Sequence, residues 1–390
     1  MRVVISALFA LSCCVACSSD EKSAQSSSGG ANQGGGASQG GAGNGGGGQA
    51  AQQGGASGTG GSSAVAGAGS GICGAQAGQL FDANHPWNQK VASSALDSES
   101  AAIIQYLDTN HTASARFQID GPSDEPNSLY GIALLSANAS TPKRTFTPTD
   151  DFYDPDCDPA ALPVPASGAV EGETGYACEG DGDCHLLVID SAACRLYEMW
   201  RANISGSTFE GGCQAVWDLH QTYTPTLRGD CCTSADAAGL PIAAHLFSAD
   251  EIAAGEIKHA IRFILPNQHM RARVYVRPAT HSVGATTGPA TAPPYGSRLR
   301  LKASYDVSQL SAGAKVVARA LKDYGMILSD GGNVTFTATS DRFTTAKWPD
   351  VGLGPRDLTS LRWSDFEVVQ LGARYTFDSA CDCRHTPVTQ

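Results

Sequence analysis

Acidic and imidazole side chains gather in the segment 233–281, which holds four of the nine histidines of the chain. Four of its residues lie near expected turns and strand ends: Asp236, Glu256, His259 and His281. Carboxylates and imidazoles that converge on one bond can act as general acid and base, or can bind a metal ion. Burial would raise the pKa of such carboxyl groups. The segment therefore predicts a catalytic site formed by these four residues.

A second set of side chains is predicted to contact a substrate: His185, Glu198, Asp218 and Trp217. Two carboxyl groups that flank one bond are what glycoside hydrolysis requires, and a tryptophan ring offers a stacking surface for a sugar. Each residue also has a structural interpretation, as a turn acid, a core histidine or a core aromatic. Both interpretations stay open at this point.

Several familiar catalytic motifs are missing from residues 73–390. The segment contains no G-x-S-x-G elbow, no H-E-x-x-H, no P-loop and no dinucleotide fingerprint. Their absence argues against the usual serine esterases, zinc proteases and nucleotide-binding enzymes. No cofactor and no metal site are expected, although a metal-dependent hydrolase remains a third functional alternative.

The elements that must position these residues can be predicted from local signals. Ser248 and Glu251 have the spacing of a capping box, and Gly255 is a natural helix stop, so a short helix lies between them. Alternating apolar residues then predict strands at 256–265 and 271–278, most simply paired as antiparallel neighbours.

The rest of the chain alternates in the same way between short strands and a few helices. Strands are predicted at 185–190, 194–200, 215–219, 298–307, 326–329, 334–339 and 365–371, and helices at 98–108, 312–324 and 357–361. The strands at 185–190 and 194–200 read as a hairpin, as do those on either side of the turn at 330–332. The pattern favours a mainly β fold with helical insertions (α+β), arranged as a sandwich or jelly roll.

The N-terminal region predicts export and membrane anchoring. Arg2, an apolar run and small residues before Cys17 are typical of a secretory signal, and Val15-Ala16-Cys17 resembles the lipobox of bacterial lipoproteins, with Cys14 where Leu is usual. Residues 1–17 are therefore expected to be a signal peptide that leaves a lipidated Cys17. Residues 18–72, rich in Gly, Ser, Ala and Gln, are expected to form a disordered tether that precedes one globular domain at 73–390. The predicted location is the bacterial envelope or cell surface.

Cysteine number agrees with export. Ten cysteines remain after Cys17, and an even number in an exported protein predicts up to five disulfides. The alternative is a metal site at Cys231-Cys232 or at Cys381 and Cys383, but neither has the paired spacing of structural zinc. The formal net charge of −12 argues against a nucleic-acid partner. The membrane is expected to be contacted only through the lipid.

Eight segments together resemble a family of secreted bacterial proteins that has no known activity. They are PWN near residue 86, HLLVID, LYEMW, SADAAGLP, GEIKHAIRF, PATH, RLRLKASYDVS and ALKDYGMILSDGG. The resemblance extends from Phe81 to Val369 and implies one integrated domain. It implies no catalytic role for any residue.

Two main hypotheses follow for the function. The first is a surface-tethered enzyme that acts on an extracellular polysaccharide as a glycoside hydrolase or lyase. The alternative is a non-catalytic surface lipoprotein that binds a glycan or another envelope component. Convergence of Asp236, Glu256, His259 and His281 in one cleft would favour the enzyme, and their separation would favour the binding protein.

Overall fold

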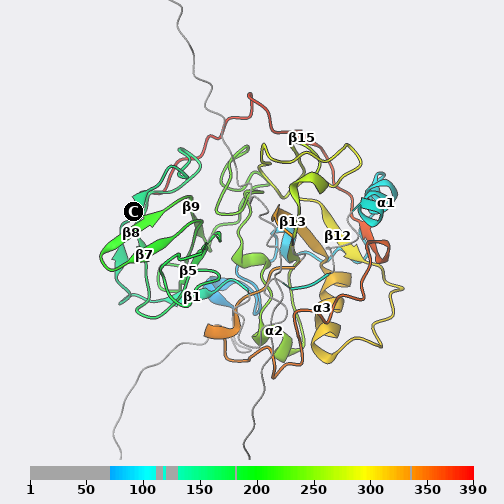
Figure 1. Ribbon diagram of the computed structural model, residues 1–390, viewed down its shortest axis with the longest axis horizontal. Coiled ribbons are helices and arrows are strands. Elements are labelled where there is room, and N and C mark those ends of the chain that lie inside the picture. The colour runs from blue at the N-terminus through cyan, green and yellow to red at the C-terminus, as the bar shows by residue number, and fades with distance from the viewer. Residues whose placement is uncertain (1–70, 111–116, 120–130, 181, 334–335) are drawn as a thin grey trace, which may run out of the picture. The chain divides into compact units, whose positions relative to one another are not determined.

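Strands outnumber helices in the part of the chain that the structure describes. The computed structural model describes residues 71–110, 117–119, 131–180, 182–333 and 336–390 (Figure 1). The expected signal peptide, Cys17 and almost all of the tether lie outside these residues. All of the described residues belong to one compact unit, with fifteen strands and three α-helices. The predicted mainly β fold with helical insertions is confirmed.

The first four-stranded sheet has the order β1-β5-β6-β9. Its strands are β1 (Leu134–Ala137), β5 (Leu186–Asp190), β6 (Arg195–Met199) and β9 (Gln214–Asp218). β5, β6 and β9 pair as antiparallel neighbours, which confirms the predicted hairpin and third strand, while β1 runs parallel to β5. Both faces of this sheet are buried, which explains the unbroken apolar sequence of β5.

The second four-stranded sheet has the order β10-β13-β12-β14. Its strands are β10 (Ile261–Leu265), β13 (Met326–Gly331), β12 (Arg298–Leu301) and β14 (Phe366–Val368). β10 and β13 are parallel, and the other pairs are antiparallel. Each large sheet therefore contains one parallel pair, and this strand order does not confirm a jelly roll.

The predicted antiparallel pairing of 256–265 with 271–278 is wrong. β10 begins only at Ile261, and its neighbour in the sheet is β13. The second segment contributes only β11 (Val274–Tyr275), which pairs with β15 (Tyr375–Thr376) near the C-terminus. All five residues of β10 are buried, as expected for a strand whose two faces are covered.

The short strands lie mostly beside the first sheet. β2 (Lys143–Arg144) pairs with β4 (Leu162–Pro163), and β3 (Thr147–Pro148) forms a small sheet with β8 (Thr208–Gly211) and β7 (Asn203–Ser205). The expected return of 334–339 onto β13 is not found in the described residues of that segment, because Phe336 bridges Phe263 of β10 instead.

The three helices follow their local signals. α2 (Ala249–Ala254) has the predicted capping box between Ser248 and Glu251, and Gly255 closes it with a φ of 80°. α3 (Ala312–Asp323) is capped by Ser311, and α1 is Ser100–Asn110. The segment 357–361 forms turns rather than the predicted helix. No helix among the described residues is long and apolar enough to cross a membrane.

Five disulfides pair all ten cysteines, as predicted. They join Cys73 to Cys194, Cys157 to Cys213, Cys178 to Cys184, Cys231 to Cys381, and Cys232 to Cys383. Two groups of described side chains are close enough together to hold a metal, and both include disulfide sulfurs, which are not thiolate ligands. The disulfides of the adjacent Cys231 and Cys232 fix the C-terminal segment at two neighbouring points, and we call this pair of disulfides the double clamp.

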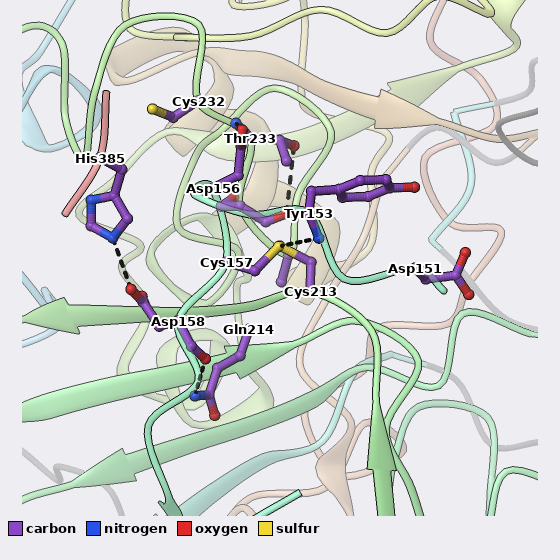
Figure 2. Close-up of a disulfide and its surroundings, with 12 residues drawn as sticks. Asp151, Tyr153, Asp156, Cys157, Asp158, Cys213, Gln214, Cys232, Thr233 and His385 are labelled. Atoms are coloured by element: carbon purple, nitrogen blue, oxygen red, sulfur yellow. Dashed lines mark hydrogen bonds and ion pairs between the residues drawn. A yellow bond between two sulfur atoms is a disulfide. The ribbon is translucent and has the colours of Figure 1, made fainter. Parts of the chain in front are cut away.

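A buried carboxylate ties the same C-terminal segment to the first sheet. Asp158, next to the Cys157–Cys213 disulfide, is fully buried (Figure 2). Its Oδ1 accepts hydrogen bonds from His385 Nε2 at 2.8 Å and from the Val388 backbone N–H at 2.7 Å. Its Oδ2 accepts from Arg228 Nη2 at 2.8 Å. The C-terminal segment is therefore held by both covalent and charged contacts.

Candidate functional site

The four residues predicted to be catalytic lie in separate sets of contacts. Asp236 is buried and pairs with Arg262, whereas Glu256 is exposed beside Lys258. His259 is buried and contacts Glu251, and His281 is half-buried, with its Nδ1 2.8 Å from the Ala237 carbonyl. No hydrogen bond or ion pair joins any two of these four described residues.

The positions of the two carboxylates have simple causes. Glu256 follows the left-handed Gly255 and precedes β10, so it lies in an exposed bend and not on a buried strand face. Asp236 lies in a loop that is held against β13 by a hydrogen bond from the Ala238 N–H to the Ser329 carbonyl. Burial therefore raises the pKa of Asp236, as predicted, whereas Glu256 is exposed to solvent.

The residues predicted to bind substrate are divided in a similar way. Trp217 is fully buried, and its Nε1 donates to Glu198 Oε2 at 3.0 Å, so it offers no stacking surface. Asp218 is exposed at the end of β9, where Oδ1 accepts from the His220 N–H. Glu198 and His185 are buried, and both belong to a larger group of charges.

That group, which we call the buried network, lies where the two large sheets meet. Its members are Asp236, Arg262, Asp330, Glu198, His185 and Glu171. Arg262 of β10 donates from Nε and Nη2 to Asp236 Oδ1, at 3.0 and 2.8 Å. The same Nη2 lies 2.8 Å from Asp330 Oδ2 on the neighbouring strand β13. The parallel pairing of β10 with β13 is what brings these two residues together.

Glu198 and His185 complete the network from the first sheet. Glu198 accepts hydrogen bonds from the Ile242 and Ala243 N–H groups at 3.1 and 2.7 Å. His185 Nδ1 lies 2.5 Å from Glu171 Oε2, and its Nε2 lies 3.1 Å from the Ala235 carbonyl. Because both ring nitrogens face acceptors, the imidazolium form satisfies this position.

Burial and charge shift the pKa values of this network strongly. Burial raises the pKa of Asp236 to about 8, against the effect of Arg262. Burial also raises the pKa of Glu198 to about 7, although three N–H donors favour its ionised form. Burial would lower the pKa of His185, but the Glu171 carboxylate more than offsets this and raises it to about 9. Such shifts occur at catalytic sites and also in structural ion-pair networks.

The buried network leaves little room for chemistry. Arg262 is bonded to two carboxylates and to Thr337 Oγ1, so it has no free edge for a substrate anion. One oxygen, Asp236 Oδ2, is buried without a hydrogen-bond partner. None of the network residues lines either of the two cavities that are described below. The arrangement is that of a structural core with one orphan oxygen.

A cavity of about 100 Å³ lies beside α2, and we call it the α2 cavity. Its polar wall includes Gln79, Glu251 and His259, and its apolar wall includes Leu80, Leu134, Leu246 and Phe343. His259, a predicted catalytic residue, is therefore the one member of that set which faces a cavity.

The polar wall of the α2 cavity is built from the helix cap. Glu251 Oε2 accepts from the Ser248 N–H and hydroxyl, both at 2.9 Å, and Oε1 lies 3.1 Å from His259 Nε2. His259 Nδ1 lies 2.9 Å from the Ala260 carbonyl, so both ring nitrogens again face acceptors. Burial opposes protonation of His259, but Glu251 outweighs it and the pKa is raised.

Gln79 adds an unsatisfied acceptor to that wall. Its Nε2 donates to the Lys258 carbonyl at 2.8 Å, which fixes the orientation of the amide. Its Oε1 is buried and has no hydrogen-bond partner, and the residue is only 7% exposed. Sequence analysis did not single out Gln79, because its contact with Lys258 joins residues 179 positions apart.

The loop at 242–245 connects the two sites. The Ala243 N–H donates to Glu198 of the buried network, while Ala243 and Ala244 line the α2 cavity.

Comparison with protein-family models, curated proteins and solved structures finds no match to this chain. The geometry of the two sites is therefore the basis for a functional proposal.

Proposed function

We propose that this protein is an exported, lipid-anchored surface protein that binds a hydroxyl-rich extracellular glycan at the α2 cavity without turnover. The observation that carries the proposal is the separation of the residues expected to catalyse. A hydrolase or lyase needs an acid and a base on one bond, and no hydrogen bond or ion pair joins any two of the described residues Asp236, Glu256, His259 and His281. The cavity, in contrast, offers space and an unsatisfied acceptor.

Localisation at the cell surface is part of the same proposal. The five disulfides fit an oxidising, extracellular environment. The lipobox-like Val15-Ala16-Cys17 and the Gly-rich segment after it support a lipid on Cys17 and a tether. A binding protein held in this way would collect or retain glycan near the envelope.

A polysaccharide hydrolase is the second candidate, because Asp236 Oδ2 is buried without a partner. Burial raises the pKa of Asp236, which is the direction that a general acid requires. Arg262 Nη2 contacts both Asp236 and Asp330 at 2.8 Å, so the two contacted oxygens lie within about 5.6 Å of each other, whereas the carboxyl groups of retaining glycosidases are roughly 5–5.5 Å apart. Arg262 itself occupies the space between them, which disfavours this candidate.

The test is to measure retention and turnover with the same exported chain. We expect it to be retained on at least one immobilised polysaccharide and to release no reducing ends or unsaturated products. Glu256→Gln is the matched control, and it should behave like the wild type in both assays. Release of products that Asp236→Asn abolishes would replace the binding function with the hydrolase, and retention on no glycan would refute the proposal.

A further inference from the structure

The α2 cavity contains a hydrogen-bond acceptor that the protein leaves unused. A buried carbonyl oxygen without a partner loses its hydrogen bond to water and gains none in return, so buried acceptors normally have a donor. Gln79 Oε1 is such an oxygen, in a residue that is nine-tenths buried and lines the cavity. The rest of Gln79 is fixed by its Nε2 hydrogen bond to Lys258. A bound donor is the simplest way to satisfy Oε1.

The charges around the cavity are already compensated within the protein. Glu251 Oε1 lies 3.1 Å from His259 Nε2, so these two polar groups are already bonded to each other. Asp250 also lines the cavity, but its two oxygens accept hydrogen bonds from the Thr345 and Ala346 N–H groups. An anionic ligand would find no cation there, and a cationic ligand would find its carboxylates engaged. The donor is therefore expected to be neutral.

The size and the apolar wall restrict the ligand further. A cavity of about 150 Å³ admits a single benzene ring, so the 100 Å³ here takes only part of one sugar ring, and the rest of that ring lies outside the cavity. The apolar side chains of Leu80, Leu246 and Phe343 also line the cavity, and Phe343 is 36% exposed. A sugar ring presents hydroxyl donors on its edge and C–H groups on its face, which matches a cavity lined by both polar and apolar side chains.

The second cavity lacks these features. It is a more open hollow of about 460 Å³ near Arg144 and Tyr176. Arg144 Nη2 donates to the Gly206 and Ser207 carbonyls, and the Tyr176 hydroxyl donates to the Pro165 carbonyl. Glu173 Oε1 accepts from two backbone N–H groups. The side chains of Arg144, Tyr176 and Glu173 are thus already bonded within the protein.

We propose that the α2 cavity binds one neutral sugar ring at the end of a glycan, with a ring hydroxyl donating to Gln79 Oε1 and the C–H face on Phe343. This inference rests on the proposed glycan-binding function and names the ligand class of the same site. Glu251 accepts a second ligand hydroxyl while it keeps its hydrogen bonds to Ser248 and His259. The remainder of the glycan extends into solvent.

The experiment is calorimetric titration of the exported chain with single-ring probes at neutral pH. The neutral probes are the methyl glycosides of glucose, galactose, mannose and N-acetylglucosamine, and the charged probes are glucosamine and glucuronate. At least one neutral glycoside should bind, and glucosamine and glucuronate should both bind more weakly than this glycoside. Tighter binding of glucosamine or glucuronate than of every neutral glycoside would overturn the inference.

Two variants locate the binding. Gln79→Leu removes the acceptor and should weaken the neutral glycoside about fivefold, as expected for the loss of one hydrogen bond. Phe343→Ala should also weaken it, while Leu96→Ala, at another exposed apolar residue, should leave it unchanged. If Gln79→Leu does not fold, Phe343→Ala decides. If the wild type is retained on a polysaccharide but Gln79→Leu and Phe343→Ala bind the neutral glycoside with unchanged affinity, only the inference about the α2 cavity is refuted. If the wild type is retained on no glycan, the proposed glycan-binding function is refuted as well.

Discussion

The buried network and the α2 cavity are built from the same kinds of side chain, and each leaves one buried oxygen without a hydrogen-bond partner, but only one of these oxygens belongs to a residue that lines a cavity. In the network, Arg262, Glu198 and His185 bond to the carboxyl groups of Asp236, Asp330 and Glu171, to Thr337 and Trp217, or to the backbone. In the cavity, Glu251 and His259 pair in the same way, yet Gln79 Oε1 faces no protein donor. Only the second arrangement also has room for a ligand.

The difference shows that a shifted pKa alone does not mark a functional site. The largest carboxyl shifts belong to Asp236 and Glu198, and both result mainly from burial among packed side chains. Such charges are retained because removing one partner would leave the other uncompensated. Space and an unsatisfied polar atom are the better indication of binding here.

The largest predicted effect concerns the double clamp next to the loop that carries Asp236. Replacing all four of Cys231, Cys232, Cys381 and Cys383 with Ser removes two disulfides, whose cysteines are 150 and 151 residues apart in the sequence. The chain-entropy model predicts a loss of about 5 kcal/mol in unfolding free energy, measured by denaturant titration. Replacing only the Cys231–Cys381 pair should cost far less, because the second disulfide closes a loop of nearly the same length. Equal losses in the two variants would contradict this account of the clamp.

The next largest effect tests whether the network is structural. Arg262→Met leaves Asp236 and Asp330 without their shared cation and should lower the unfolding free energy by about 3–5 kcal/mol. Arg319→Met is the control, because this exposed arginine makes one hydrogen bond to the Gly255 carbonyl, and its cost should stay within about 0.5 kcal/mol. A stable Arg262→Met variant would show that the network carries little of the stability.

A smaller effect should appear in the dependence of stability on pH. His185 has a folded pKa raised to about 9, so its contribution is complete below its unfolded value and is lost as the pH rises through 9. His281 has a folded pKa lowered to about 4 by burial, so its contribution is present above its unfolded value and is lost as the pH falls through 4. We therefore expect the unfolding free energy, measured from pH 4 to 9, to depend less on pH than in the wild type. For His185→Gln the weaker dependence should appear on the alkaline side, and for His281→Gln on the acid side.

The two variants act as controls for each other in this measurement. The alkaline contribution of His185 should be on the order of 3 kcal/mol, since its pKa rises from 6.5 to about 9 and one pKa unit corresponds to about 1.4 kcal/mol. If His185→Gln changed the acid side and not the alkaline side, the ion pair with Glu171 would not be the source of the raised pKa.

Local signals predicted the local structure well. Ser248, Glu251 and Gly255 correctly bounded α2, the helix predicted at 312–324 matches α3, and apolar runs located the hairpin of β5 and β6. These features depend on residues a few positions apart, so the sequence contains the whole signal. The number of disulfides followed from the even cysteine count in an exported chain.

Non-local pairing was the source of the errors. The parallel contact of β10 with β13 joins segments about 65 residues apart, and no local pattern distinguishes it from an antiparallel hairpin with 271–278. That pairing puts Arg262 beside Asp330 and leaves Glu256 outside the sheet. Gln79 is 179 positions away in the sequence from Lys258, the residue that it contacts. No local sequence pattern therefore predicts that its Oε1 lies in a cavity without a hydrogen-bond partner.

The most direct test of the central claim is a crystal structure of the exported chain with the neutral glycoside that binds best. The account predicts the sugar ring in the α2 cavity, with a hydroxyl within hydrogen-bond distance of Gln79 Oε1 and the ring face against Phe343. The buried network should be unchanged, with Arg262 still bonded to Asp236 and Asp330. A sugar bound between Asp236 and Asp330, with Arg262 displaced, would contradict the account and favour the hydrolase.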